Sequence, residues 1–494
     1  MTLSLERRAD LWGDRTAVVD AGDDRRVSYA DLDRLADRFA GALADRGVGE
    51  RDAVAVVSRN RVELLALLFA ARRLGAALAP VSHRLTPATV EGPLDVVDPA
   101  LVVHEPAQRD LIREVGDEDA RSFGELRAEA EGEPKGYERV DTDPERSLLY
   151  LHTKGRADVR GDDSDPDQVT AERVVDLPER AVEWNCITAV AAWGLGRGDC
   201  APTLLPLSDT DGLHRLVLPL LYVGGRVVVL RAFDPERALG VVEDRGATHL
   251  FAGATEYREL VADGAFERTD FGGVEWFGTR SPLPTDAREA LADRAPVVRA
   301  YGRVETGPND LYLPAERASA SADPDRVGRP FPDCEARIVG DADATVPEGE
   351  VGGLELRGPV TARGYVDGET FGEWVPTGDL AYREGGDYHV LGPTAEAAEG
   401  EGERIHPRTV ERALEAHEGV TEAGAVVDSE GALAAVVGDA DPGELRAFVA
   451  DRLPERAVPR EISVVESLPR RATGEPDRAE IRRQLGGEER FETE

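Results

Sequence analysis

Residues 274–302, VEWFGTRSPLPTDAREALADRAPVVRAYG, contain the pattern that decides the fold of this chain. The first part, VEWFGTR (274–280), is a short run with aromatic and β-branched residues, which predicts a strand. DAREALADR (286–294) has the composition of a surface helix, and VVRAYG (297–302) predicts a second strand. A strand, a helix and a strand in this order predict two parallel strands covered by the helix.

The same rhythm is found on the N-terminal side of this stretch. DAVAVVS (52–58) predicts a strand, RVELLALLFAARRL (61–74) a helix, and AALAPV (76–81) another strand. GRVVVL (225–230) and THLFAGA (248–254) predict two further strands that flank a helix. The chain is therefore predicted to be an α/β protein, with a large N-terminal domain of layered, largely parallel sheets and helices.

The pattern changes near the C-terminus. Two helices, 407–417 and 442–453, alternate with three short strands, which predicts a compact α+β unit. Residues 392–406 are rich in Gly, Ala and Glu and poor in large apolar residues, as is typical of a linker or hinge. We therefore expect an N-terminal domain over 1–391, a hinge over 392–406 and a C-terminal domain over 407–494.

The charge balance is strongly acidic, with 97 Asp and Glu against 59 Lys and Arg and a net charge of −38. Such a surface repels phosphate backbones and anionic lipids, which argues against nucleic-acid binding and a membrane-surface role. Lys135 and Lys154 are the two lysines of the chain. An acidic surface almost without lysine is typical of a halophilic cytoplasm, although a codon bias also favours arginine. No membrane span or signal peptide is predicted, so we expect a cytoplasmic protein.

The three cysteines, Cys186, Cys200 and Cys334, are odd in number and far apart. No pair has the spacing of a zinc site, and so few cannot form a disulfide framework. We expect them to be buried thiols.

Six stretches carry further motifs. They are the segment from WGLGRGD to GRVVVL (193–230), YGRVETGPNDLYLP (301–314), VGRPFPDCEARIV (327–339), LELRGPVTARGY (354–365), WVPTGDL (374–380) and LPRRATG (468–474). In this order and spacing they resemble the adenylate-forming superfamily of AMP-forming acyl-CoA synthetases, luciferases and peptide-synthetase adenylation domains. The resemblance covers nearly the whole chain.

The resemblance implies a fold and a reaction. The expected fold is an N-terminal domain of two layered sheets and a small barrel, followed by a small C-terminal lid that rotates between two half-reactions. In the first, a carboxylic acid attacks ATP to give an acyl-adenylate and pyrophosphate. In the second, the thiol of CoA displaces AMP. The implied ligands are ATP or AMP, CoA, Mg²⁺ and a small carboxylic acid.

Part of the implied nucleotide site is present. By resemblance, Tyr301 and Gly302 bind adenine, Glu305 is the catalytic carboxylate that coordinates Mg²⁺, and Asp379 accepts the ribose hydroxyls. Val304 replaces the threonine whose hydroxyl meets phosphate in the family.

The implied phosphate loop, LHTKGRADVRG (151–161), departs from the family pattern. The residues that remain compatible with it are Thr153, Arg160 and Gly161. Two family glycines are replaced by Lys154 and Ala157, and a loop that approaches phosphate closely tolerates side chains poorly. Two interpretations remain open: an anion site rebuilt on Lys154, Arg156 and Arg160, or a solvated loop without a ligand.

The implied acyl pocket is altered too. Asp209 stands where the family has histidine, and a carboxylate that faces an incoming carboxylate is electrostatically unfavourable. His214 is expected to be a core or surface histidine. Thr279 and Arg280 replace a glycine pair, so their side chains are expected to intrude on the substrate space, where Arg280 could instead neutralise a ligand carboxylate.

The implied lid departs most. Glu475 stands where the family has its catalytic lysine, and neither lysine of the chain lies in the lid. Arg478 is a poor substitute, since a planar guanidinium is not interchangeable with an ammonium. Exchanging an attraction for a repulsion at 4 Å costs up to about 8 kcal/mol at an effective dielectric constant near 20.

Three functions are compatible with these residues. The first is an acid–CoA ligase-family protein with weakened or lost adenylation. The second is a non-catalytic ligase-fold protein that binds a nucleotide, CoA or an acyl group, or regulates an active paralogue, and the third keeps only the thioester half-reaction. The sequence leaves open the identity of the acid and a homo- or hetero-oligomeric state.

Overall fold

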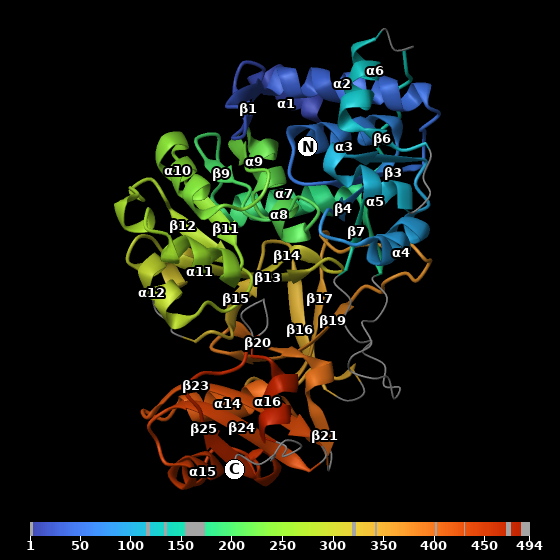
Figure 1. Ribbon diagram of the computed structural model, residues 1–494. Coiled ribbons are helices and arrows are strands. Elements are labelled where there is room, and N and C mark those ends of the chain that lie inside the picture. Colours follow the sequence, from blue (N-terminus) through green and yellow to red (C-terminus); the bar gives the residue numbers. More distant parts are fainter. Residues whose placement is uncertain are drawn as a thin grey trace. The chain divides into compact units, whose positions relative to one another are not determined.

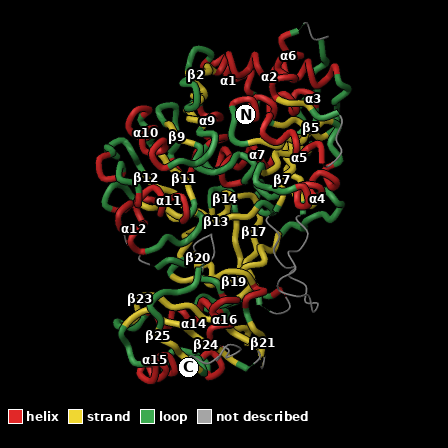
Figure 2. Tube along the Cα trace, in the orientation of Figure 1, coloured by secondary structure: helices red, strands yellow, loops and turns green. Residues whose placement is uncertain are grey.

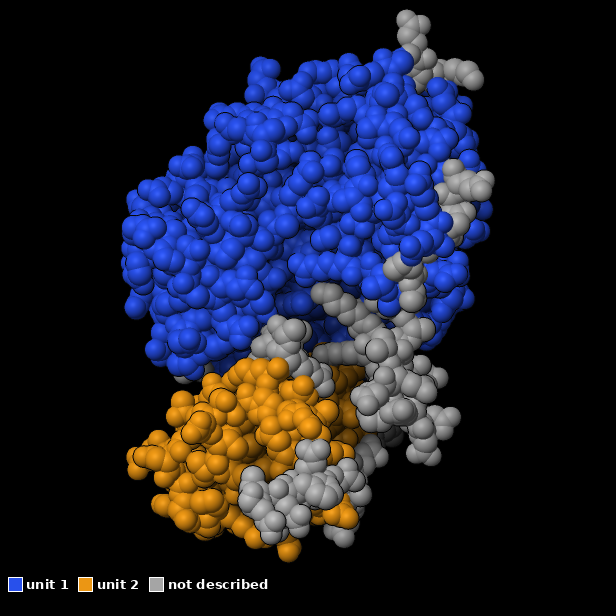
Figure 3. All heavy atoms as spheres, viewed as in Figure 1, with its two compact units in different colours: residues 1–156, 165–336, 355–377 blue, residues 157–164, 337–354, 378–494 orange. Residues whose placement is uncertain are grey.

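The computed structural model describes most of the chain. The described residues are 3–114, 119–132, 136–153, 173–318, 323–340, 343–400, 403–428, 430–470 and 476–485. They form two compact units (Figure 3). Unit 1 comprises Met1–Arg156, Asp165–Ala336 and Glu355–Thr377, and unit 2 comprises Ala157–Ser164, Arg337–Leu354 and Gly378–Glu494.

The first sheet of unit 1 has seven strands in the order β18-β8-β7-β4-β3-β5-β6. Their bounds are β3 Ala53–Ser58, β4 Ala77–Ser82, β5 Leu101–His104, β6 Arg121–Ser122, β7 Ser147–His152, β8 Val174–Pro178 and β18 Gly364–Tyr365. Strands β3 to β7 pair in parallel, whereas β8 and β18 are antiparallel. All six residues of β3 are buried, as expected for a strand that is covered on both faces.

The second sheet has four strands in the order β2-β1-β10-β9. Their bounds are β1 Thr16–Asp20, β2 Arg25–Ser28, β9 Cys200–Pro202 and β10 Arg226–Val229. A third set comprises β11 His249–Ala252, β12 Trp276–Thr279, β13 Val297–Arg303, β14 Gly307–Leu313 and β15 Arg326–Pro330. Strands β11, β12 and β13 are parallel, as predicted, and the chain then turns back into antiparallel β14 and β15.

Helices alternate with these strands along the trace (Figures 1 and 2). The α-helices of unit 1 are α1 Leu5–Trp12, α2 Tyr29–Asp45, α3 Val62–Leu74, α4 Pro87–Val97, α5 Arg109–Glu114, α6 Phe123–Glu131, α7 Glu179–Trp193, α8 Thr210–His214, α9 Val217–Val223, α10 Pro235–Arg245, α11 Ala254–Ala262, α12 Thr285–Ala292 and α13 Ala315–Ala318. Short 3₁₀ turns lie at Pro106–Gln108 and Phe266–Arg268. Helix α2 begins with a reciprocal capping box between Ser28 and Asp31, and α10, α11 and α12 pack on β11 and β12 through one apolar cluster.

Unit 2 contains an α+β core. Its elements are α14 Pro407–Glu415, β23 Val420–Asp428, β24 Gly431–Gly438, α15 Pro442–Ala450, β25 Glu461–Val464, α16 Arg478–Leu485 and a 3₁₀ turn at Glu455–Ala457. Strands β23 and β24 are antiparallel, and β25 joins β24 in parallel. The order of α14, β23, β24, α15 and β25 is the one predicted from the sequence, whereas α16 was not predicted.

Several strands lie where the two units divide along the chain. The boundaries fall inside β16 Glu335–Val339, β17 Gly352–Arg357 and β19 Val375–Glu384. Strand β20, Asp387–Pro393, pairs with β19 in unit 2.

The segment 392–406 has more local structure than its composition indicated. It holds a 3₁₀ turn, Thr394–Glu396, and an antiparallel hairpin of β21 Ala398–Gly400 and β22 Glu403–Ile405. This local structure adds to what the composition indicated, whereas the role of the segment as a linker or hinge and the predicted boundaries 1–391 and 407–494 stay predictions.

The burial of the cysteines and the length of the helices bear on two further expectations from the sequence. All three cysteines are buried free thiols, as predicted. Within the part of the chain that the structure describes, no helix has both the length and the apolar character required to cross a bilayer.

Candidate functional site

The segment that carries Tyr301 and Gly302 is the end of β13 and the tight turn into β14. A side chain at position 302 would place its Cβ 2.1 Å from the carbonyl oxygen of Pro308, so only glycine fits. Gly307 has φ +88, a conformation that other residues rarely adopt. Thr306 closes the turn, because its Oγ1 accepts the Arg303 N–H at 3.2 Å. The backbone geometry of the turn between β13 and β14 therefore requires the glycines at positions 302 and 307 on its own.

Glu305 lies in this turn with 8% of its surface exposed. Its backbone carbonyl accepts the Ala362 N–H at 3.1 Å, which fixes the residue against the segment before β18. Tyr365 Oη donates to Glu305 Oε1 at 3.3 Å, and Arg303 Nε lies 3.6 Å from Oε2. Burial and the neighbouring Glu305 raise the pKa of Tyr365 to about 12, so the tyrosine remains a donor.

Tyr365 also connects Glu305 to the base of the predicted phosphate loop. The guanidinium of Arg173 lies 3.4 Å from the centre of the Tyr365 ring, a cation–π contact. Two hydrogen bonds join the backbone of Arg173 to Thr153. The Thr153 N–H donates to the Arg173 carbonyl at 2.8 Å, and the Arg173 N–H donates to Thr153 Oγ1 at 3.2 Å. These bonds close the end of the β7–β8 hairpin, so Thr153 has a structural role here. Lys154, Arg156, Ala157, Arg160 and Gly161 lie outside the described residues.

The predicted acyl-pocket residues meet in a buried ion cluster. Asp209 is the N-cap of α8, and its side chain accepts the Asp211 N–H at 3.1 Å. Arg280 Nη1 lies 2.9 Å from Asp211 Oδ2 and 3.8 Å from Asp209 Oδ2. Arg215 holds the other oxygen of Asp211 at 2.8 Å. Two carboxylates and two guanidiniums thus share one cluster.

The charge of this cluster corrects one inference from the sequence. The repulsive carboxylate predicted at Asp209 has a cation beside it, because Arg280 lies between Asp209 and Asp211. Burial alone would raise the pKa of Asp211, but Arg215 and Arg280 outweigh it and keep that pKa below its ordinary value. Arg280 in turn contacts carboxylates of the chain itself, and its side chain is still 38% exposed.

The neighbouring Thr279 and His214 have partners in the fold. Thr279 is 3% exposed, and its hydroxyl donates to the Ser281 carbonyl at 3.0 Å. His214 is fully buried, which lowers its pKa to about 4, and its Nδ1 lies 3.4 Å from Thr210 Oγ1. Of the two predicted locations, core or surface, His214 lies in the core, and its Nε2 has no hydrogen-bond partner.

Arg215 is the functional-site neighbour that sequence reasoning missed. It is 1% exposed, donates to Asn309 Oδ1 at 3.2 Å and also donates to the Pro308 carbonyl. It thereby joins the ion cluster of α8 to β14, directly after the 301–307 turn. The spacing of Asp211 and Arg215, four residues apart on one helix, was a signal that could have revealed the pair.

Asp379 belongs to unit 2, where it lies in β19 opposite Pro393 of β20. It is 4% exposed and follows Gly378, whose φ of +72 requires glycine. Glu475, predicted to replace the catalytic lysine, lies outside the described residues.

Arg478, three residues further on, starts α16 and is bound within unit 2. Its Nε donates to Glu396 Oε2 at 2.7 Å, and its Nη1 pairs with Glu411 and donates to the Ala425 carbonyl at 2.7 Å. Glu411 is 1% exposed. Burial alone would raise the pKa of Glu411, but Arg478 and Arg408 outweigh it and keep that pKa below its ordinary value. Arg478 is thus the cation that compensates a buried carboxylate of the unit 2 core.

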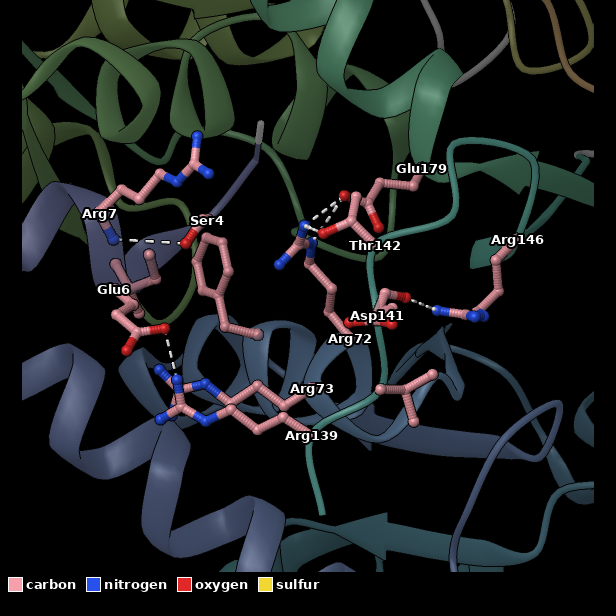
Figure 4. A pocket seen from close by; sticks show the side chains of 13 residues that line it. Ser4, Glu6, Arg7, Arg72, Arg73, Arg139, Asp141, Thr142, Arg146 and Glu179 are labelled. Carbon is pink, nitrogen blue, oxygen red and sulfur yellow. Dashed lines mark hydrogen bonds and ion pairs between the residues drawn. The ribbon is translucent and has the colours of Figure 1, made fainter. Parts of the chain in front are cut away.

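A separate pocket of about 200 Å³ lies between α1, α3 and the 139–146 segment of unit 1 (Figure 4). The arginines that line it are Arg7, Arg72, Arg73, Arg139 and Arg146. Arg72 pairs with Glu179, Arg139 with Glu6, and Arg73 with Asp33. Carboxylates of the chain therefore compensate these three arginines. We interpret the residues around the pocket as an ion-pair network that joins the 139–146 segment to α1 and α3.

Comparison with known proteins defines the class of the chain. The profile of the AMP-binding enzyme family matches residues 5–175 and 174–366, and that of the AMP-binding enzyme C-terminal domain matches residues 409–475. The chain belongs to the family of AMP-binding enzymes. The predicted superfamily and the predicted α/β fold with a smaller C-terminal part are confirmed.

Several individual relatives of the chain are acid–CoA ligases. Indoleacetate–CoA ligase of Aromatoleum aromaticum is 28% identical over 517 residues, which cover 97% of this chain and 96% of the relative. Feruloyl-CoA synthase of an Amycolatopsis species is 28% identical over 506 residues, 97% of this chain and 98% of the relative. The crystal structure of ATP-bound MatB from Rhodopseudomonas palustris is similar with a TM-score of 0.80 and 25% identity, and covers 98% of this chain and 99% of that chain.

Proposed function

We propose that the chain is an acid–CoA ligase-family protein in which adenylation of the acid is weakened or lost. The reaction of the class joins a carboxylic acid, ATP and CoA into acyl-CoA, AMP and pyrophosphate through an acyl-adenylate. The single observation that carries the proposal is the position of Arg478 in unit 2. Two carboxylates and a carbonyl bind this arginine, which is the cation closest in sequence to Glu475.

The residues of the predicted nucleotide site indicate which steps of this reaction the chain could support. We assign adenine binding to Tyr301 and Gly302, and ribose binding to Asp379. Glu305 presents a carboxylate to Mg²⁺, and this residue fits the role once Arg303, at 3.6 Å, gives up its contact. Mg²⁺ bound there would neutralise phosphate charge.

We assign the phosphate contacts to Thr153, Arg160 and Gly161, and the acyl pocket to Asp209, Thr279 and Arg280. Arg280 Nη1 already contacts Asp211 at 2.9 Å. A substrate carboxylate therefore meets a guanidinium whose charge is partly neutralised by the chain, which favours weak ground-state binding of the acid.

The electrostatic balance decides the rate of the first half-reaction. The attacking carboxylate and the α-phosphate are both anionic, and the family stabilises their approach with a lysine where this chain has Glu475. Each 1.36 kcal/mol lost from transition-state stabilisation slows the step about tenfold. A repulsion of even about 4 kcal/mol therefore removes roughly three powers of ten from the rate. The thioester half-reaction, which breaks the acyl–phosphate bond, is less dependent on this cation.

Pyrophosphate release tests the proposal. The full chain is incubated in concentrated KCl with Mg-ATP and a panel of aryl and fatty acids, with and without CoA. Slow release that is abolished by Asp379→Ala supports a weakened ligase, whereas rapid release with any acid contradicts the proposal. A chemically prepared acyl-adenylate, supplied together with CoA, tests separately whether thioester formation persists.

A second candidate is a non-catalytic protein that binds a nucleotide, CoA or an acyl group, or that regulates an active paralogue. The observation that favours it is the structural need for Gly302, since the motif would be kept by the fold without any reaction. Calorimetry distinguishes the candidates: AMP or CoA binding by a chain that releases no pyrophosphate and forms no thioester supports the second.

The charge of the chain adds a proposal about its surroundings. A net charge of −38 with two lysines suits a salt-rich cytoplasm, where counterions screen the repulsion between carboxylates. A melting temperature that does not rise between dilute buffer and concentrated KCl would contradict this.

A further inference from the structure

Three possible metal ligands lie at the N-terminal ends of neighbouring strands in unit 1. Asp199 directly precedes β9, His249 is the first residue of β11, and Glu275 directly precedes β12. One donor atom from each lies within 4.8 Å of the other two. The strand ends are fixed beside one another, because Thr248 N–H donates to the Cys200 carbonyl at 2.8 Å and Glu275 N–H to the Thr248 carbonyl at 2.7 Å.

The hydroxyl of Thr248 lies beside the first ring nitrogen of His249. Thr248 Oγ1 accepts the Cys200 N–H at 3.0 Å and lies 3.3 Å from the Cys200 carbonyl oxygen. His249 Nδ1 lies 2.7 Å from the same Oγ1, in a hydrogen bond that either atom can donate. When Nδ1 donates this bond, the lone pair of Nε2 is free for a metal ion.

The second ring nitrogen faces a carboxylate. His249 Nε2 is buried and has no hydrogen-bond partner, and Glu275 Oε2 lies 3.5 Å away. The side chain of His249 is 1% exposed. A cation held between the lone pair of Nε2 and the Glu275 carboxylate would be stabilised by both.

The remaining contacts are those of a supported ligand set. Asp199 Oδ2 accepts the Gly196 N–H at 2.7 Å, while Oδ1 lies 4.0 Å from His249 Nδ1. The Trp276 ring packs edge-on against His249 with centroids 4.6 Å apart, which restricts the orientation of the imidazole. A ligating histidine usually donates its other N–H to an oxygen, and Thr248 Oγ1, 2.7 Å from Nδ1, can accept it here.

We propose that Asp199, His249 and Glu275 bind a divalent transition-metal ion, with Zn²⁺ as the best match. One imidazole and two carboxylates suit Zn²⁺, whereas Mg²⁺ and Ca²⁺ prefer oxygen ligands alone. Glu275 is 63% exposed, which gives the ion a path from solvent. The bound ion would fasten the starts of β9, β11 and β12 together.

This site is separate from the predicted ligase residues. Glu275 precedes β12 and Arg280 follows it, so the two lie at opposite ends of the strand, roughly 17 Å apart at 3.3 Å per residue. A metal there acts on the stability of the sheet, and its binding can be measured without any ligase activity.

The test is calorimetric titration of Zn²⁺ into the full chain in KCl buffer that contains excess Mg²⁺. We expect one saturable site per chain, and absorption bands typical of nitrogen and oxygen ligation when Co²⁺ replaces Zn²⁺. Glu275→Gln should weaken binding at least about tenfold, and His249→Gln should abolish it. Glu289→Gln is the matched control, since its side chain is 66% exposed and lies on α12.

The outcomes are decisive in both directions. Zn²⁺ should raise the melting temperature of the wild-type chain and of Glu289→Gln, but not that of Glu275→Gln. The proposal is overturned if no saturable site is found, or if Glu275→Gln binds Zn²⁺ as tightly as the wild type. Should His249→Gln fail to fold, the exposed position of Glu275 leaves its variant to decide.

Discussion

Arg280 of unit 1 and Arg478 of unit 2 are both bound by carboxylates, but their surroundings differ. Arg280 shares Asp211 with a second cation, Arg215, and 38% of its side chain is exposed. Arg478 is 17% exposed, lies against Glu411, and also binds a backbone carbonyl. The sequence suggested a ligand-binding role for the first and a weak substitute role for the second.

The difference indicates which arginine can exchange its partner. Asp211 keeps Arg215 when Arg280 moves, so Asp211 is not left as an unpaired buried charge. When Arg478 moves, Glu411 retains Arg408 at 3.4 Å and the hydrogen bond from the Ala425 N–H at 2.9 Å. Removing one partner of a buried pair commonly costs about 3–5 kcal/mol. Arg280 is therefore available to a ligand, whereas Arg478 is fixed by the stability of unit 2.

The largest effect on stability is expected for Arg478→Gln. It should lower the free energy of unfolding by about 2–4 kcal/mol, because Glu411 is left with one distant cation. Denaturant unfolding followed by far-UV circular dichroism measures this. Arg483→Gln is the control on the same helix, since its side chain is 57% exposed, and we expect a change below about 0.5 kcal/mol. Equal effects of both variants would show that Arg478 is not a buried structural cation.

Acid should destabilise both units through their buried histidines. Burial lowers the pKa of His214 in unit 1 and of His406 in unit 2 to about 4, below the ordinary 6.5. The unfolded state then binds more protons between these values, so the free energy of unfolding falls as pH drops from 6.5 toward 4. The loss is about 2 kcal/mol per histidine between pH 6.5 and 5.

Thermal melts at pH 7, 6 and 5 measure this loss, with His417→Gln as a control at a histidine whose side chain is 13% exposed. If His214→Gln and His406→Gln variants keep the full pH dependence of the wild type, these two histidines are not its source.

The smallest effect is expected for Arg280→Gln. Asp211 keeps Arg215, so the free energy of unfolding should fall by about 1 kcal/mol or less. Tryptophan fluorescence is a suitable signal, since all five tryptophans belong to unit 1. A loss as large as that of Arg478→Gln would contradict the difference drawn between the two arginines.

Elements that depend on local sequence patterns could be predicted, whereas features that depend on contacts between distant residues could not. The periodicity of 274–302 gave β12, α12 and β13, and Ser28 with Asp31 gave the start of α2, since both depend on neighbouring residues. The hairpin β21–β22 was missed, because three-residue strands carry too little periodicity.

The ion cluster of the candidate site was missed for another reason. Arg280 and Asp211 are 69 residues apart, and only the packing of α8 against the end of β12 brings them together. Sequence reasoning found Asp209 and Arg280 as altered positions but could not show that one compensates the other.

The measurement that tests the central claim most directly is pyrophosphate release by Glu475→Lys beside the wild type, with Glu475→Gln as the neutral control. An ammonium at this position should restore attraction for the phosphate, so we expect Glu475→Lys to release pyrophosphate about 10–1,000-fold faster than the wild type, with Glu475→Gln in between. A Glu475→Lys variant no faster than the wild type would contradict the claim that a missing cation in unit 2 limits adenylation.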